Sequence, residues 1–136
     1  MRTIMLVGEA DSGKTTTLHL VLLKMGKVKS ADNDSKISQL GVYAADFECT
    51  VTYKRKKIAF YTAGDVESSV KNAIENYERK GVDVLICAGR PNFEIVTTQA
   101  QSNSKNFIPV SKQKSSDESK QISEDEKVAN EILNNI

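Results

Sequence analysis

The chain has 136 residues, 39% of them apolar, which is enough for one modest hydrophobic core, and a single domain is expected at this length. Its 19 basic and 18 acidic side chains leave a formal charge of +1, so composition gives no reason to expect binding to nucleic acid or to an anionic membrane. No apolar run approaches the roughly 20 residues that a membrane-spanning helix needs, and we expect a cytoplasmic protein.

The first quarter of the chain predicts a strand, a helix and a loop. Residues 3–7 (TIMLV) form a short apolar run that ends at Gly8, which is typical of a buried parallel strand. Apolar residues then recur at helical spacing over 14–25, and Gly26 is a plausible end for this helix. Residues 27–41 are polar and rich in turn formers, so a loop is expected there.

The middle of the chain predicts a hairpin and a second helix. Apolar and polar residues alternate over 47–53, which indicates a half-exposed strand. A charged turn over 54–57 leads into a second strand, 58–62, and so short a connection implies an antiparallel pair. The strand 47–53 should therefore lie at an edge of the sheet. Helical spacing over 66–80 follows.

The remaining elements complete an alternating pattern. Residues 82–88 form an almost continuous apolar strand, a short helix follows Pro91, and 106–111 form a last strand whose Pro109 favours an edge position. Residues 112–123 are highly charged and predict a flexible polar loop. A terminal helix is expected from about 124 to 135.

Strands that alternate with helices favour a three-layer α/β fold. We expect a mostly parallel sheet of about five strands with one antiparallel edge strand.

Cys49 and Cys87 both fall in predicted strands and are interpreted as buried thiols. His19 is the one histidine, and no cysteines are paired in sequence, so the ligands of a zinc site are missing. We interpret His19 as a packed helix residue rather than a base.

The stretch between the first strand and the first helix predicts an anion site. Residues 8–15, G-E-A-D-S-G-K-T, match G-x-x-x-x-G-K-[ST] at every position, and the flanking strand and helix are the context this motif requires. Glycines let successive backbone N–H groups face one anion. The helix that begins near Lys14 adds its unpaired amides and the positive end of its dipole. The alternative is an ordinary strand–turn–helix connection.

This motif is the Walker A motif, and through it the chain resembles the P-loop NTPase superfamily. Residues 1–136 are expected to form one such domain, and the resemblance covers the predicted topology of nearly the whole chain, but its specific evidence is concentrated in eight residues. It implies a P-loop NTPase-like sandwich that binds ATP or GTP together with Mg²⁺. Lys14 would reach the β- and γ-phosphates, and the Thr15 hydroxyl would ligate Mg²⁺. The nucleotide-binding residues implied here are Gly8, Glu9, Ala10, Asp11, Ser12, Gly13, Lys14, Thr15 and Thr16.

A second segment is similar to part of the Ras-like GTPases. Tyr61-Thr62-Ala63-Gly64-Asp65 resembles the D-T-A-G-Q segment of that family, with Tyr61 in place of the aspartate and Asp65 in place of the glutamine. Gly64 keeps the position whose N–H contacts the γ-phosphate there. Asp65 could hold the metal through water, position the attacking water or a substrate hydroxyl, or only cap the helix that starts at Val66. We expect Asp65 to be catalytic together with Lys14, and to share the metal with Thr15.

Other polar residues near the strand ends have weaker signals. Arg90 follows a central strand, where it would either clamp phosphate oxygens or pair with an acid on the surface. Asp46, Asp32 and Asp34 could substitute as the metal-side acid, and Ser35 or Ser38 could supply a hydroxyl, but for each of these a surface residue without a role is the simpler interpretation. The guanine-reading N-K-x-D motif of GTPases is absent over 110–114, so the base remains open.

Three functions remain in competition. A switch-like NTPase would hydrolyse ATP or GTP, with catalysis by charge stabilisation. A small-molecule kinase could use the same loop. A regulatory module would bind a nucleoside triphosphate with little turnover and change its contacts with a protein partner. The short chain favours work with another protein or as an oligomer, whose state the sequence leaves open.

Overall fold

The computed structural model describes residues 1–9, 12–26, 38–39, 46–101, 106–113 and 117–136. Its elements are, in chain order, β1 (Arg2–Val7), α1 (Lys14–Lys24), β2 (Ser38–Gln39), β3 (Phe47–Tyr53), β4 (Lys56–Tyr61), α2 (Glu67–Arg79), β5 (Val84–Gly89), α3 (Glu94–Gln101), β6 (Phe107–Ser111) and α4 (Glu118–Asn134). None of these helices is long and apolar enough to cross a membrane.

The strands form one mixed sheet in the order β2-β3-β4-β5-β1-β6. Strands β4, β5, β1 and β6 are mutually parallel, and β3 runs antiparallel to both β4 and β2. The α/β class and the predominantly parallel sheet are thus confirmed. Strand β6 lies at the outer edge, as Pro109 predicted, because a residue without an N–H is tolerated where no further strand pairs.

The opposite edge differs from the prediction. Residues 27–41 were expected to form a loop, but Ser38 and Gln39 pair with Glu48 and Phe47 as β2, so β3 is not the outermost strand. A strand of two residues is too short to show an alternating pattern, which explains why the sequence did not reveal it. The rest of that predicted loop, including Asp32, Asp34 and Ser35, lies outside the described residues.

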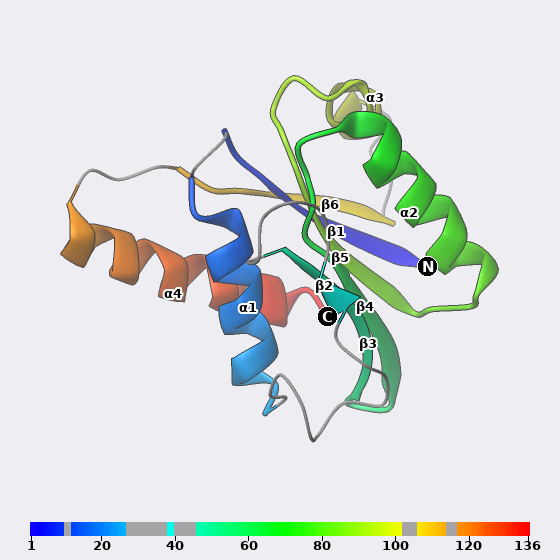
Figure 1. The fold of residues 1–136 in the computed structure, drawn as a ribbon, viewed down its shortest axis with the longest axis horizontal. Helices are drawn as coiled ribbons and strands as arrows, with labels where there is room; N and C mark the ends of the chain where they lie inside the picture. The colour runs from blue at the N-terminus through cyan, green and yellow to red at the C-terminus, as the bar shows by residue number, and fades with distance from the viewer. Residues whose placement is uncertain (10–11, 27–37, 40–45, 102–105, 114–116) are drawn as a thin grey trace.

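Helices cover both faces of the sheet, which gives three layers (Figure 1). On one face, α1 and α4 lie side by side and bury Leu18, Val21 and Leu22 of α1 with Val128, Ala129 and Ile132 of α4. On the other face, α2 and α3 pack over strands β1, β4 and β5. The core residues Ile4, Leu6, Ile86 and Phe60 are fully buried against the first pair of helices.

The terminal helix begins earlier than expected. Residues 112–123 were predicted to be a flexible loop, yet α4 starts at Glu118, and Lys112 is only 3% exposed. The first turns of α4 are polar, and their one aliphatic residue, Ile122, points into solvent, so no apolar stripe marks them. Asp117 caps the helix by accepting a hydrogen bond from the Ser119 N–H at 3.0 Å.

Candidate functional site

The glycine loop, which we define as residues 8–15, starts where the carboxyl ends of three parallel strands meet. The Gly8 N–H donates to the Gly89 carbonyl at the end of β5 at 3.1 Å, and the Lys112 N–H donates to the Val7 carbonyl of β1 at 2.8 Å. These two bonds attach the start of the loop to both neighbours of β1. Open α/β sheets bind ligands at this end of their strands.

Two glycines in the loop have positions that a side chain would not tolerate. A Cβ at Gly8 would come within 2.6 Å of the Ser12 hydroxyl and 2.8 Å of the Lys112 carbonyl oxygen. Gly13 is the N-cap of α1 and has a φ of +84°, in the left-handed region that favours glycine. The loop therefore curls tightly on itself and turns directly into the helix.

Lys14 lies inside this curl. Its side chain is largely buried, with the residue 8% exposed, and its Nζ donates to the Gly8 carbonyl at 2.6 Å and to the Glu9 carbonyl at 3.2 Å. The ammonium group is thus surrounded by backbone of the loop from which it comes.

The remaining loop residues differ in exposure. Ser12 is 2% exposed, and among the described residues its hydroxyl has no hydrogen-bond partner. A buried hydroxyl without a partner is costly unless something else satisfies it. Glu9 and Thr16 are exposed at the mouth of the loop. Ala10 and Asp11, both expected in the site, lie outside the described residues.

The Thr15 hydroxyl contacts an acid that is distant in sequence. Its Oγ1 donates to Oδ1 of Asp46 at 2.8 Å. The hydroxyl of Thr62, directly after β4, lies 3.3 Å from the same oxygen and accepts the Phe47 N–H at 2.8 Å. Asp46 was interpreted as a surface residue, and the structure instead places it beside the loop.

Asp65 and Arg90 lie together at the ends of β4 and β5. Arg90 donates from Nε and Nη2 to Oδ1 of Asp65 at 3.3 Å and 3.1 Å. The interpretation of Asp65 as a helix cap is wrong, because the N-cap of α2 is Val66 and no side chain caps it. Of the two interpretations of Arg90, the structure shows the one in which it pairs with an acid, here Asp65. The carboxylate of Asp65 therefore faces Arg90, while Thr15 faces Asp46.

Gly64 brings the segment after β4 onto the end of β5. A Cβ at this position would lie 2.5 Å from the carbonyl carbon of Ala88 and 2.6 Å from its oxygen. Only glycine allows two backbones to approach so closely. Tyr61, at the predicted aspartate position, packs beside the core under α2, as expected, and burial is the main cause that raises its pKa above 10.0.

A buried ion pair lies behind the glycine loop. Lys112 Nζ donates to Oδ1 of Asp125 in α4 at 2.8 Å, and its side chain is fully buried. Thr17 of α1 donates to the same oxygen at 3.1 Å, and Gln121 donates to it at 2.8 Å. The sequence did not single out Asp125 or Thr17, because residues in contact here are separated by as many as 108 positions.

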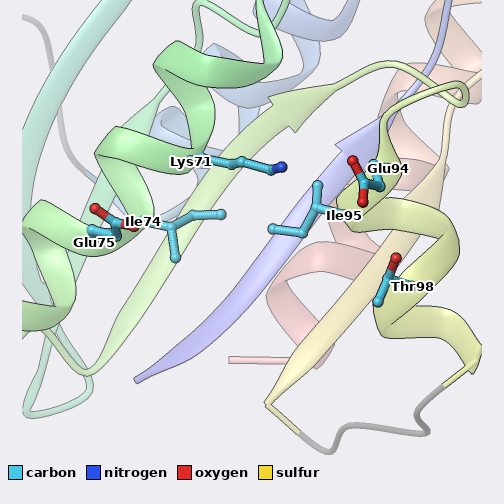
Figure 2. A pocket seen from close by; sticks show the side chains of 6 residues that line it. All are labelled: Lys71, Ile74, Glu75, Glu94, Ile95 and Thr98. Carbon is cyan, nitrogen blue, oxygen red and sulfur yellow. The ribbon is translucent and has the colours of Figure 1, made fainter.

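Two cavities deserve comparison as ligand sites. One, of about 320 Å³, borders the glycine loop at the ends of β1 and β6 and is lined by Val7, Gly8, Glu9, Pro91, Ser111, Lys112 and Gln113. Another, of about 290 Å³, lies between α2 and α3, where Ile74 and Ile95 face each other (Figure 2). Only the first adjoins the loop that the motif identifies.

The cysteine and histidine predictions are consistent with the structure. Cys49 and Cys87 are both buried, and burial raises the pKa of each thiol to about 12. His19 packs edge-on against Phe47, with ring centroids 5.9 Å apart.

The oxygen groups near Thr15 are of the kind that Mg²⁺ prefers as ligands. Within the described part of the chain, no group of three or more histidine, cysteine or acidic side chains could hold a metal alone. Mg²⁺ instead typically uses one or two protein oxygens, several waters and the phosphates of its nucleotide. The hydroxyl of Thr15 beside the carboxylate of Asp46 is such an oxygen set.

Comparison with protein-family models, with curated proteins and with solved structures gave no match for this chain.

Proposed function

We propose that this chain is a small P-loop nucleoside triphosphatase that binds ATP or GTP with Mg²⁺ at the glycine loop and hydrolyses it. The observation that supports this most directly is the buried Lys14 ammonium inside a loop closed by Gly8 and Gly13. A buried ammonium that donates to the Gly8 and Glu9 carbonyls is well placed to exchange them for phosphate oxygens, which make stronger, charge-assisted hydrogen bonds.

The start of α1 supplies the other half of the anion site. The first-turn amides of a helix have no partner within the helix, and the helix dipole adds positive potential at the same point. The buried hydroxyl of Ser12 provides one further donor in the loop. In this proposal these groups bind the β- and γ-phosphates, and Lys14 neutralises the charge that develops as the γ-phosphoryl group is transferred.

Residues at the ends of β4 and β5 complete the proposed reaction centre. When bound, Mg²⁺ supplies positive charge to the phosphates and is held on the protein side by Thr15. Gly64 lets the backbone after β4 lie against β5, where its N–H can contact the γ-phosphate. Asp65, oriented by Arg90, positions the attacking water; Arg90 could turn from Asp65 to a phosphate oxygen once nucleotide binds.

The alternatives use the same loop. A kinase would place its acceptor in the cavity bordered by Pro91, Ser111 and Gln113, which is large enough for a small metabolite. A binding module with little turnover is favoured by Tyr61, which stands where a metal-side aspartate would be expected.

One experiment separates these functions. The chain is incubated with Mg²⁺ and each of the common nucleoside triphosphates. Phosphate release and nucleotide retention are measured together, and Lys14→Ala is the negative control. Release without an acceptor supports the hydrolase. Tight retention without release supports the binding module, and turnover only after a metabolite is added supports the kinase. No retention and no release with any nucleotide would reject all three.

A further inference from the structure

We infer that Asp46 is the metal-side acid of this site: it orients the Thr15 hydroxyl and holds Mg²⁺ through a metal-bound water. This inference rests on the proposed function and replaces the expectation that Asp65 shares the metal with Thr15. It follows from where Asp46 lies in the sheet and from the direction of its hydrogen bonds.

The antiparallel hairpin places Asp46 at the end of β4 where an acid is missing. Because β3 runs antiparallel to β4, the start of β3 lies beside the end of β4, and Glu48 pairs with Tyr61. Asp46 precedes β3 by one residue, so it extends this edge past Tyr61. Asp46, directly before β3, can thus place its carboxylate where the last residue of the neighbouring strand β4 would otherwise place an acid.

The position of Asp46 is fixed from two sides. Thr62 and Phe47 exchange backbone and side-chain hydrogen bonds, with Thr62 N–H to the Phe47 carbonyl at 3.1 Å and Phe47 N–H to the Thr62 hydroxyl at 2.8 Å. Thr62 is 2% exposed, so the pair of strands is anchored directly beside Asp46. The Thr62 hydroxyl also lies within 3.3 Å of the Asp46 carboxylate.

The Thr15 hydroxyl donates its proton to Asp46, which leaves its oxygen lone pairs available to a cation. Thr15 donates its hydroxyl proton to Oδ1 of Asp46, which directs the oxygen lone pairs away from that carboxylate. A ligand held in this way by a neighbouring carboxylate is oriented and made more basic, as for other metal ligands. Mg²⁺ keeps several of its waters, and in this proposal Oδ2 of Asp46 accepts a hydrogen bond from one of them.

The test compares the two candidate acids in the intact chain. Affinities for ATP and for GTP are measured by calorimetry with Mg²⁺ and with EDTA, in the wild type, in Asp46→Asn and in Asp65→Asn. Asp46→Asn keeps an acceptor oxygen for Thr15 but loses the charge. We expect it to match the wild type in EDTA and to lose about 10- to 100-fold of affinity in Mg²⁺, the usual cost of removing a group that supports a metal ligand. Asp65→Asn should keep the wild-type dependence on Mg²⁺.

A second readout follows the metal itself. Mn²⁺ replaces Mg²⁺, and its binding to the nucleotide complex is followed by electron paramagnetic resonance. Mn²⁺ should bind more weakly in Asp46→Asn and with unchanged affinity in Asp65→Asn. Asp46→Ala is the second variant if the asparagine form does not fold. In the double variant Thr15→Ala/Asp46→Asn, the losses should not add, because both groups act through one metal contact.

The outcomes separate this inference from the proposed function. A wild-type dependence on Mg²⁺ in Asp46→Asn, or its loss in Asp65→Asn, overturns the inference while nucleotide binding stands. A wild-type chain that binds neither nucleotide, with Mg²⁺ or with EDTA, overturns the proposed function and the inference with it.

Discussion

Lys14 has the least ambiguous role of the residues in the glycine loop. In Lys14→Ala the buried ammonium and its two hydrogen bonds to loop carbonyls are lost, so a triphosphate would lose its ammonium partner in the loop. We expect its affinity to fall by about 100-fold or more, or about 3 kcal/mol, the value of charged hydrogen bonds at a buried site. Calorimetry with ATP and GTP measures this, and circular dichroism checks that the fold remains.

Lys24→Ala is the matched control for Lys14→Ala, since it removes an exposed lysine from the other end of the same helix. The affinity of Lys24→Ala for ATP and GTP should equal that of the wild type. A Lys14→Ala chain that binds as tightly as this control would refute the assignment of the loop.

The two thiols provide a test of burial at the residue scale. Because burial raises the pKa of Cys49 and of Cys87 to about 12, almost none of either thiol is ionised near neutral pH. We expect neither to react with iodoacetamide in the native protein and both to react after unfolding in urea. Mass spectrometry counts the adducts, and rapid labelling of the folded chain would contradict the described core.

Single residues show where sequence reasoning succeeds and where it fails. The spacing of Gly8, Gly13 and Lys14 was sufficient to predict the loop, because all three lie on one short segment with its own geometry. The partner of Thr15 was not predictable in this way, since Asp46 is 31 residues away. Contacts of this kind depend on how strands pair, and no local pattern encodes them.

At the scale of elements, one buried ion pair joins α4 to the segment that follows β6. Lys112 has a fully buried side chain, so Asp125→Ala would leave its ammonium without a carboxylate partner. We expect a loss of about 3 kcal/mol in the free energy of unfolding in urea. Lys112→Met should cost less, because Asp125 would keep its hydrogen bonds from Thr17 and Gln121.

The exposed pair between Lys24 of α1 and Glu126 of α4 is the control for this prediction. It joins α1 to α4 in solvent, and Glu126→Ala should cost less than about 1 kcal/mol. Equal losses in Asp125→Ala and Glu126→Ala would show that the buried pair has no special role.

The contact between α2 and α3 predicts a dependence on pH. Glu67 accepts the Ile95 N–H at 3.0 Å, and this hydrogen bond is the main cause that lowers the pKa of Glu67 below 4.5. Its contribution to stability is therefore present above the unfolded pKa and is lost as the pH falls through the lower, folded pKa. Between about pH 5 and about pH 3, the melting temperature should fall more steeply in the wild type than in Glu67→Gln.

Identical slopes in the wild type and in Glu67→Gln would mean that Glu67 does not titrate through this contact.

Elements were predictable where apolar residues follow a regular period or form a continuous run. Strand β3 and the helices α1 and α2 show such a period, and the strands β1, β4 and β5 contain apolar runs. Each was expected within a few residues of its observed bounds. The start of α4 was missed because polar contacts, such as Gln121 with Asp125, stabilise it instead of an apolar face. A two-residue strand such as β2 has no pattern of its own.

At the scale of the whole molecule, the elements around the glycine loop come from distant parts of the chain. The loop follows β1, Asp46 leads into β3, Thr62 follows β4, and Asp125 lies on α4 (Figure 1). A bound triphosphate would contact the glycine loop directly. It would act on Asp46 through Thr15 and on Asp125 through Thr17. We therefore expect nucleotide to raise the melting temperature of the entire domain in one transition.

The most direct test of the central claim is a titration of the ¹⁵N-labelled chain with ATP and with GTP in the presence of Mg²⁺, followed by amide chemical shifts. We predict that at least one nucleotide causes its largest changes at Gly8 and at Ser12 to Thr16. Shifts that are absent with both nucleotides, or that are centred on the cavity between α2 and α3, would contradict the account.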